Sequence, residues 1–554
     1  GADGGGGDRF GTRVVADGER LAVGAYRDIG TEQGSAYVFA RTGTTYKETR
    51  KLTADDRASY DYLSLGLGLS GEVVLAGAYG DDDKGTLSGS AYFFELCEAK
   101  KETKITASDG YNSDEFGYAV AVSGDTAVVG SRYDDDYGTN SGSAYVFTRS
   151  GQSWGQQQKL NASDAGAHDY FGWSVSVSGD TTVVGAQRED QQGTDAGAAY
   201  VFARTGTSWS QQGKLTAWDG TTSDYFGTAV ATTSDTAVVG SYLDDNARGG
   251  DAGAAYVFAR TGTTWSHQLK IIASDGGASD HFGYAVSISG NTALIGSRYD
   301  DDRAGNAGAA YVYTRTGTSW SVQEKLTASN GGGSDYFGEA VSVSGDLAVV
   351  GAYLEDQRGS NAGAAYVFAR SGTLWSQQQK ITAQDGRAND WFAQSVAVSG
   401  DKILVGSRYD DDKGTNSGGA YLYKRSGNMW VHWMKWVASD GYGSDEFGIS
   451  VALSGDVPVV GANYDDDLGG SSGSAYILNS ECTGSTGGKC TQNSDCSTGF
   501  CVDGVCCNSA CGGGSAGDCQ ACSVAAGAAK DGTCGAVKKG LSCRAASGGC
   551  GSGA

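Results

Sequence analysis

The chain has 554 residues, among them 90 Gly and one Pro, and its formal net charge is −24 at pH 7. This excess of acidic residues disfavours nucleic acid as a partner and favours cations, basic proteins or glycans held through bound Ca²⁺. No apolar run reaches the roughly 18 residues that a membrane-spanning helix requires, and four His and two Met leave few residues for metal, acid–base or redox chemistry.

An internal repeat with spacings of 53 to 56 residues runs through most of the chain. Its anchor is an aromatic residue, replaced once by Leu, at Phe10, Leu63, Phe116, Phe171, Phe226, Phe282, Phe337, Phe392 and Phe447. Self-similarity at a fixed period is the signature of an array of structural units. The sequence therefore contains nine repeats.

The repeat that begins at Phe337 shows the expected elements in chain order. Residues 340–344 alternate small apolar residues with Ser, and residues 347–352 form a nearly continuous apolar run that suits a strand buried on both faces. A polar loop at 355–363 leads to two further strands, 364–370 and 375–382, joined by Ser-Gly-Thr. Four short strands with Gly at the turns, and no sustained helical period, indicate the blade of a β-propeller.

We therefore expect an all-β fold, with a propeller of four-stranded antiparallel blades over residues 1–480 and a small disulfide-rich region over residues 481–554. A closed ring hides the lateral edges of its sheets, and the repeat phase never breaks, so we predict nine blades in one propeller. Seven blades with two extra units, or an open array, are the alternatives. The ninth repeat lacks a fourth strand before Cys482, and we expect that strand from residues upstream of Gly1, from the Cys-rich region or from a neighbouring subunit.

The aromatic residues of the repeat are assigned to packing. Phe at the entry to the innermost strand fills the space between blades, where its burial is worth about 2–3 kcal/mol, and the Gly beside it lets backbones approach. Six Trp open the fourth strand, and packing at the blade edge is preferred for them over a sugar-binding ring. These are Trp154, Trp209, Trp265, Trp320, Trp375 and Trp430.

Acidic residues collect on one expected face. In an up-and-down blade, the loops between strands two and three share a face with the links between blades. Carboxylates clustered in such loops suit Ca²⁺, which takes about six to eight oxygen ligands. The best candidate ligands are Asp134, Asp136, Asp300, Asp302, Asp410, Asp412, Asp465 and Asp467. The alternative is that these residues form side-chain turns and keep the surface soluble.

The Phe-Gly start, the Val-Val-Gly-Ala run and the Gly-Ser-Ala-Tyr-Val-Phe strand resemble the FG-GAP repeat family, found in integrin α-subunit propellers and many bacterial surface proteins. The resemblance covers residues 1–480, although Leu63-Ser64 and Phe392-Ala393 replace Phe-Gly. It implies a seven-bladed ring as the usual form. The family's Ca²⁺ loop lies between strands one and two, where this chain has only Ser-Gly-Asp, so those metal residues do not carry over.

The last 73 residues have a different composition. They hold twelve Cys: Cys482, Cys490, Cys496, Cys501, Cys506, Cys507, Cys511, Cys519, Cys522, Cys534, Cys543 and Cys550. A region with so few large apolar side chains requires covalent cross-links for stability, and we expect up to six disulfides made in an oxidising compartment. The segment resembles Cys-rich parts of secreted or surface proteins from myxobacteria. Zinc at Cys519 and Cys522 is the rival interpretation, and Cys97 is free, paired with this region or intermolecular.

We do not expect an enzyme. The four His fall at different repeat positions and form no catalytic or metal-binding arrangement, and no blade-specific polar residues are expected to cluster at the channel entrance. The leading hypothesis is a secreted, non-catalytic propeller that mediates adhesion or binding of a protein or glycan at the cell surface. The alternatives are a structural subunit of a fibre or surface layer, bound to copies of itself, and an enzyme with a site in the channel. Any export signal is expected to have been removed or to lie outside the sequence.

Overall fold

The computed structural model describes residues 9–17, 20–28, 32–42, 45–54, 59–70, 73–78, 90–95, 102–151 and 153–478, and four two-residue strands near the C-terminus. Those strands are β36 (Cys501–Val502), β37 (Val505–Cys506), β38 (Gln520–Ala521) and β39 (Gly535–Ala536). Every regular element in these ranges is a strand, and the same ranges contain no helix that could cross a membrane. Contacts divide the chain into two compact units, residues 100–481 and residues 1–99 with 482–554.

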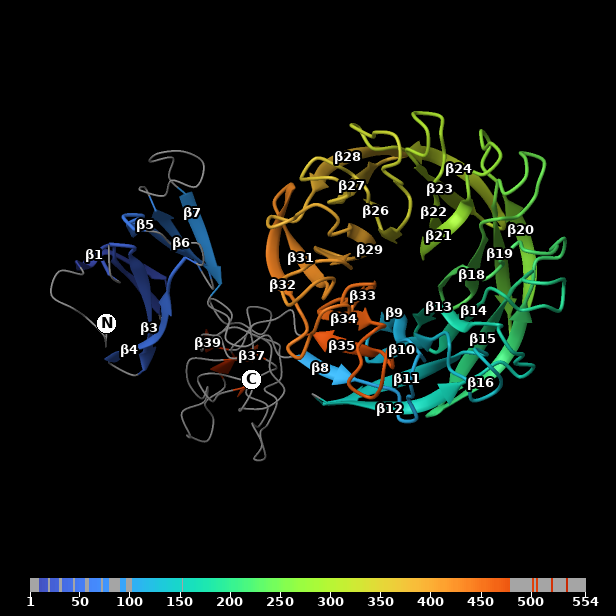
Figure 1. Ribbon diagram of the computed structural model, residues 1–554, viewed down its shortest axis with the longest axis horizontal. Helices are drawn as coiled ribbons and strands as arrows, with labels where there is room; N and C mark the ends of the chain where they lie inside the picture. The colour runs from blue at the N-terminus through green and yellow to red at the C-terminus, as the bar shows by residue number, and fades with distance from the viewer. Residues whose placement is uncertain are drawn as a thin grey trace, which may run out of the picture. The chain divides into compact units, whose positions relative to one another are not determined.

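Residues 102–478 form a ring of seven antiparallel sheets, each with four strands (Figure 1). The first three sheets are β9 (Phe116–Ser123), β10 (Thr126–Ser131), β11 (Ser143–Ser150) and β12 (Ser153–Leu160); β13 (Phe171–Ser178), β14 (Thr181–Ala186), β15 (Ala198–Thr205) and β16 (Ser208–Leu215); and β17 (Ala229–Thr232), β18 (Thr236–Ser241), β19 (Ala254–Thr261) and β20 (Thr264–Ile271). The first strand of each sheet lies nearest the axis of the ring.

The next three sheets repeat this order. They are β21 (Phe282–Ser289), β22 (Thr292–Ser297), β23 (Ala309–Thr316) and β24 (Ser319–Leu326); β25 (Val341–Ser344), β26 (Leu347–Ala352), β27 (Ala364–Ser371) and β28 (Leu374–Ile381); and β29 (Phe392–Ser399), β30 (Lys402–Ser407), β31 (Gly419–Ser426) and β32 (Met429–Trp436). The four strands expected after Phe337 are confirmed to within one residue at each end.

The seventh sheet closes the ring. It consists of β33 (Ser450–Ser454), β34 (Val457–Ala462) and β35 (Ser474–Leu478), and its outer strand is β8 (Glu102–Ile105), from the other end of the ring segment. In the β35–β8 ladder Ala475 faces Ile105 and Leu478 faces Glu102. Phe116 also bridges Gly473, so the first sheet continues directly from the last.

Residues 9–95 contain two further sheets, which belong to the other unit. One comprises β1 (Phe10–Asp17), β2 (Arg20–Ala25), β3 (Ser35–Thr42) and β4 (Thr45–Leu52), and the other β5 (Leu63–Ser70), β6 (Val73–Ala78) and β7 (Ser90–Glu95). All nine repeats thus give antiparallel sheets, as predicted, but the prediction of nine blades in one ring is wrong. Because β8 pairs with β35 and not with β7, the ring closes after seven sheets. The prediction that the closing strand comes from upstream of Gly1, from the Cys-rich region or from a neighbouring subunit is also wrong, because β8 supplies that strand.

The Phe-Gly motif packs as predicted. The seven Phe of the ring repeats, such as Phe337, are 0% exposed, and the Phe337 ring lies 5.4 Å from that of Tyr366 on the third strand. A Cβ at Gly130 of the second strand would overlap the carbonyl oxygen of Gly172 in the next sheet. Glycine at both positions therefore allows the sheets to approach at the axis.

The Trp residues that open the fourth strand support the same packing. Trp209, Trp320, Trp375 and Trp430 are buried, while Trp154 and Trp265 are half-buried. Trp375 Nε1 donates to Gln323 Oε1 of the preceding sheet at 2.9 Å. Packing between neighbouring sheets is therefore confirmed for the four buried Trp.

Ten of the twelve C-terminal Cys, and Cys97, lie outside the described residues. Cys501 and Cys506 are backbone partners in the β36–β37 pair. The predicted disulfides and the rival zinc interpretation stay predictions.

Candidate functional site

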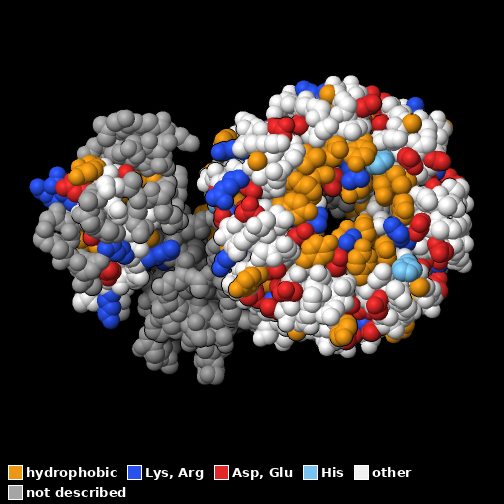
Figure 2. All heavy atoms as spheres, in the orientation of Figure 1, with side chains coloured by type: hydrophobic (Ala, Val, Ile, Leu, Met, Phe, Trp, Pro, Cys, Tyr) orange, Lys and Arg blue, Asp and Glu red, His pale blue; other side chains and the backbone are white. Residues whose placement is uncertain are grey.

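The loops between strands two and three, and the links between sheets, define what we name the loop face of the ring. On the face drawn in Figure 2, acidic side chains surround the ring, while hydrophobic side chains, Tyr included, gather around a hollow centre with Lys and Arg among them. Two kinds of candidate site lie here. The first contains the predicted metal ligands, and the second lines the centre.

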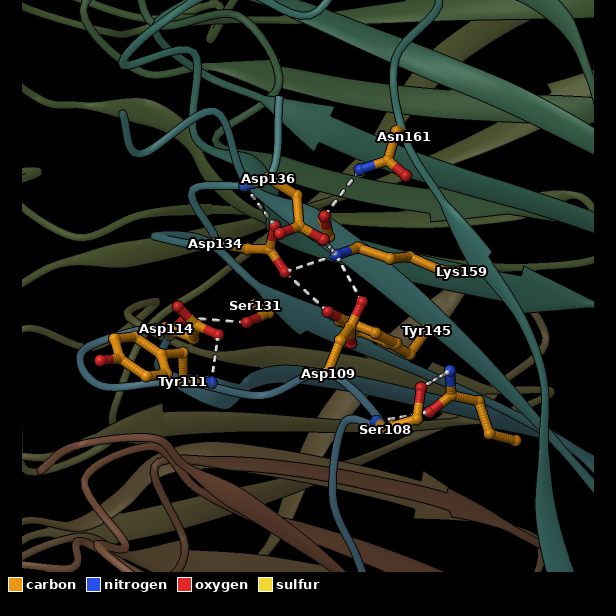
Figure 3. A network of polar contacts seen from close by, with 12 residues as sticks. Ser108, Asp109, Tyr111, Asp114, Ser131, Asp134, Asp136, Tyr145, Lys159 and Asn161 are labelled. Atoms are coloured by element: carbon orange, nitrogen blue, oxygen red, sulfur yellow. Dashed lines mark hydrogen bonds and ion pairs between the residues drawn. The ribbon is translucent and has the colours of Figure 1, made fainter. Parts of the chain in front are cut away.

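The predicted ligands Asp134 and Asp136 come together, but around a lysine (Figure 3). Lys159 Nζ of β12 lies 2.9 Å from Asp134 Oδ2 and 2.9 Å from Asp109 Oδ2, and it also pairs with Asp136. The hydroxyl of Tyr145 donates to Asp134 Oδ2 at 2.6 Å. We name such an arrangement a lysine cluster, meaning an outer-strand Lys with the polar groups of the loop and link that bind its ammonium.

The other three predicted pairs lie in equivalent clusters. Asp300 and Asp302 bind Lys325 at 2.8 and 2.7 Å. Asp410 and Asp412 bind Lys435 at 2.7 and 2.6 Å. Asp465 and Asp467 bind Lys104 at 2.8 and 2.5 Å. The two residues of each predicted pair therefore lie in one cluster, together with a lysine that was not predicted. Its signal was the Lys that follows each Trp by five residues in the fourth strand.

Charge pairing controls ionisation in these clusters. Burial raises the pKa of Asp109, but hydrogen bonds from Lys159 and Tyr145 outweigh burial and hold that pKa below its ordinary value. The same balance lowers the pKa of Asp385 beside Lys435. Asp109 and Asp385 of the links are therefore kept ionised as partners of an ammonium group.

Two of these clusters also have the spacing of a metal site. Oxygen atoms of Asp385, Asp410 and Asp412 lie within 4.8 Å of one another, as do those of Asp440, Asp465 and Asp467. The ammonium of Lys435 or Lys104, however, is within hydrogen-bond distance of all three carboxylates in its cluster. Because the lysine takes the position between the oxygens, the residues as arranged do not fit Ca²⁺.

The second site is the central mouth. We define it by three sets of side chains in each ring repeat: the residue before the Phe, the two residues after the second strand, and the second residue after the Phe. In every ring repeat the residue before the Phe has positive φ, between 51 and 58°. These seven residues are Glu115, Tyr170, Tyr225, His281, Tyr336, Trp391 and Glu446. Bulky residues rarely adopt this conformation. The backbone N–H of this residue forms a hydrogen bond with the preceding sheet. Tyr170 N, for example, donates to Asn140 O at 3.3 Å.

Aromatic rings form a continuous belt through four repeats of the mouth. All its members are half-buried. Successive centroid distances are 5.8, 5.2, 4.4, 4.9, 5.8, 5.1 and 4.3 Å along Tyr225, Tyr242, His281, Tyr299, Tyr336, Tyr353, Trp391 and Tyr409. A half-exposed ring offers an apolar face together with a polar edge, which suits amphipathic ligands.

Three mouth arginines are held by glutamates. Arg132 pairs with Glu115 at 2.7 Å, Arg298 with Glu339 at 3.2 Å and Arg408 with Glu446 at 2.6 Å. The first two also stack on tyrosines, with Cζ 3.7 Å from the ring centroids of Tyr118 and Tyr284 respectively.

Arg188 is different. It lies over Tyr170 and Tyr225, at 4.9 and 5.7 Å, and its contact with Asp195 is long, at 3.9 Å. Its side chain is 39% exposed, against 11, 16 and 18% for the three arginines paired with glutamates. Arg188 is therefore the mouth arginine best placed to meet an anionic group from solution.

The expectation that no blade-specific polar residues cluster at the channel entrance is wrong. His281, one of the four His, lies in the mouth beside Tyr299. Burial, with the charge of Arg298, lowers the pKa of His281 to about 4, so its imidazole is neutral at pH 7. The missed signal was local variability, because the residue before Phe changes among Glu, Tyr, His and Trp inside otherwise uniform repeats.

Comparison with known families finds the FG-GAP repeat in nine segments. These are residues 1–39, 46–94, 100–147, 154–202, 209–258, 265–313, 320–368, 375–423 and 430–478. Each of the last eight segments begins in or near the fourth strand of one sheet and ends in the third strand of the next, and the last seven segments span the ring. No curated protein matches the chain.

Proposed function

Since the chain belongs to the FG-GAP repeat family, we propose that it is an extracellular, non-catalytic propeller that mediates adhesion or binding through its central mouth. The observation that carries this proposal is the aromatic belt with Arg188 beside it. Most ring positions repeat from sheet to sheet, whereas the mouth positions differ. A ligand held on the axis contacts several sheets at once and makes such differences useful.

The chemistry of the mouth fits a protein or a glycan with an anionic group. Tyr and Trp rings such as Tyr299 and Trp391 supply rigid contact area at low entropic cost. An arginine over aromatic rings remains well placed for planar, two-point binding of a carboxylate. On a chain with net charge −24, an exposed arginine at the centre selects where an anionic ligand docks.

Ion pairing of the mouth glutamates supports binding over catalysis. Glu115, Glu339 and Glu446 are buried, and each is bound to an arginine. Burial raises the pKa of Glu339 against the opposing effect of Arg298. A glutamate fixed in this way holds the shape of the mouth and is poorly placed to exchange protons with a substrate.

The extracellular location rests on the Cys-rich C-terminal composition and on the family, whose members include surface proteins. The proposed binding does not depend on calcium, because a lysine binds the Asp pair in each acidic cluster that was predicted as a metal site.

Binding of the purified, labelled protein to cell surfaces and to arrays of glycans tests the proposal. Trp391→Ala in the mouth is expected to weaken binding at least about tenfold, the loss of one central aromatic anchor. Tyr442→Ala is the control, because Tyr442 is an aromatic residue of a link loop and 77% exposed. Equal binding by the two variants, with unchanged melting temperatures, would contradict a ligand site in the mouth.

A structural subunit of a fibre or surface layer is the second candidate. Within the described residues, β7 is the edge of a three-stranded sheet, because the strand that follows it in the repeat, β8, belongs to the ring. An exposed edge is a template for a strand from a second copy. Electron micrographs of the native material distinguish the candidates, since isolated rings favour binding and long polymers favour assembly.

A further inference from the structure

The lysine is the constant member of the seven clusters of the ring. The lysines are Lys104, Lys159, Lys214, Lys270, Lys325, Lys380 and Lys435, one on each outer strand. Lys104, Lys159, Lys325 and Lys435 each bind three carboxylates. Lys214 and Lys270 bind two each, and Lys380 binds one. The number of carboxylates bound by each lysine therefore varies from three to one, while the ammonium is present in every cluster.

In two clusters a neutral oxygen takes the place of one carboxylate. Lys214 Nζ donates to Gln191 Oε1 at 2.8 Å, and Lys380 Nζ donates to Gln357 Oε1 at 2.7 Å. An ammonium group has three N–H donors, and it donates to charged or neutral oxygens alike. A divalent ion bound by one carboxylate and neutral groups would be weakly held, because a hard cation depends on charged oxygen ligands. The pattern therefore fits a monovalent ammonium at every cluster better than a metal.

Position adds a mechanical role. Lys435 on β32 binds Asp410 and Asp412 of the loop after β30, and Asp385 of the link before β29. One side chain thus joins the outer strand, the loop and the link of the same sheet. That is the task a metal ion would perform in an acidic loop.

We propose that each lysine is a tethered cation that takes the place of a metal ion, so that the loop face is organised without calcium. The lysine side chain is covalently part of the outer strand, so the cation cannot dissociate or be removed by a chelator. A corollary is that deleting the ammonium leaves an acquired divalent site where three carboxylates converge, and none where one remains.

Thermal unfolding of the full chain, in EDTA and in millimolar Ca²⁺, tests this inference together with Tb³⁺ luminescence. Tyr421 donates to Asp410 at 2.6 Å and would sensitise a bound lanthanide. The unchanged protein is expected to melt at the same temperature in both solutions and to give no Tb³⁺ signal. Lys435→Met is expected to melt several degrees lower in EDTA, to regain part of that loss in Ca²⁺ and to bind one Tb³⁺.

Lys380→Met is the matched control, with the same loss of an ammonium beside a single carboxylate. It is expected to melt lower in both solutions, without recovery in Ca²⁺. A rise of several degrees for the unchanged protein in Ca²⁺ overturns the inference, and that measurement stands even if a variant does not fold. A folded Lys435→Met protein that ignores both Ca²⁺ and Tb³⁺ overturns it too. Neither outcome bears on whether a ligand binds at the central mouth.

Discussion

Lys104 Nζ lies 2.8 Å from Asp465 Oδ2, although the two residues are 361 positions apart. Lys104 belongs to β8 and Asp465 to the loop after β34, so the contact joins the first strand of the ring segment to its last sheet. In the other six sheets, a cluster of this kind joins elements that follow one another in the chain. In the seventh sheet, the cluster therefore joins the two ends of the ring segment.

Lys104→Met is expected to destabilise the ring closure. It leaves Asp440, Asp465 and Asp467 without their shared ammonium, and because the Lys104 side chain is 20% exposed, we expect a loss of about 1–3 kcal/mol, less than a fully buried pair costs. Lys325→Met is the control, since its partners Asp275, Asp300 and Asp302 lie in the link and the loop that precede it in the chain, away from β8. Amide hydrogen exchange in the β35–β8 ladder should accelerate in the first variant alone, and equal acceleration would show that the cluster does not secure closure.

Phe337→Ala is expected to cost about 3–5 kcal/mol of unfolding free energy, because a large side chain with 0% exposure is removed between two sheets. Asp301→Ala, at an exposed loop position, should change stability by less than about 0.5 kcal/mol. Denaturant unfolding of the two variants checks the assignment. Similar losses would mean that the repeat Phe is not the main contact between sheets.

Stability is expected to fall as pH rises from about 4 to 7. Burial, aided by the charge of Asp134 and opposed by a hydrogen bond from Tyr111 N–H, raises the pKa of Asp114 to about 7, and burial raises that of Asp445 to about 6. The pKa of an Asp in an unfolded chain is about 3.9. The folded state thus holds these protons more tightly, so their stabilising contribution is complete below the unfolded pKa and is lost as pH rises through the folded pKa.

Melting temperatures between pH 4.5 and 8 measure this effect, and Asp114→Asn should reduce the slope because amide replaces carboxyl without titrating. At lower pH the opposite process begins. Asp109 and Asp385 have lowered pKa values, so their contribution is present above the unfolded pKa and is lost as pH falls through the folded one. A Tm that rises steadily from pH 5 to 8 would contradict the raised pKa values.

Arg188→Ala and Arg298→Ala should separate binding from stability. Arg188 is 39% exposed, and its removal is expected to change unfolding free energy by less than about 0.5 kcal/mol while weakening an anionic ligand. Arg298→Ala leaves Glu339 buried without its partner and should cost about 3 kcal/mol. Thermal unfolding and cell-surface binding are measured on both. A large stability loss in Arg188→Ala would assign that residue to structure.

Local sequence determined the sheet and its core. The alternation and turns after Phe337 gave all four strands of that repeat, since period and turn residues act over a few positions. The burial of Phe337 followed from its place at the entry to the innermost strand. The loop carboxylates were also found, because Asp134 and Asp136 are neighbours in sequence.

Tertiary structure decided what depends on partners far apart. The number of blades follows from the free edge of β35, which β8 reaches only when seven sheets have closed. Lys159 lies 23 residues from Asp136 and 50 from Asp109, so their cluster forms only when the sheet and its link are folded. The mouth gathers residues one repeat apart, such as His281 and Tyr336, and only ring closure brings those positions to a common axis.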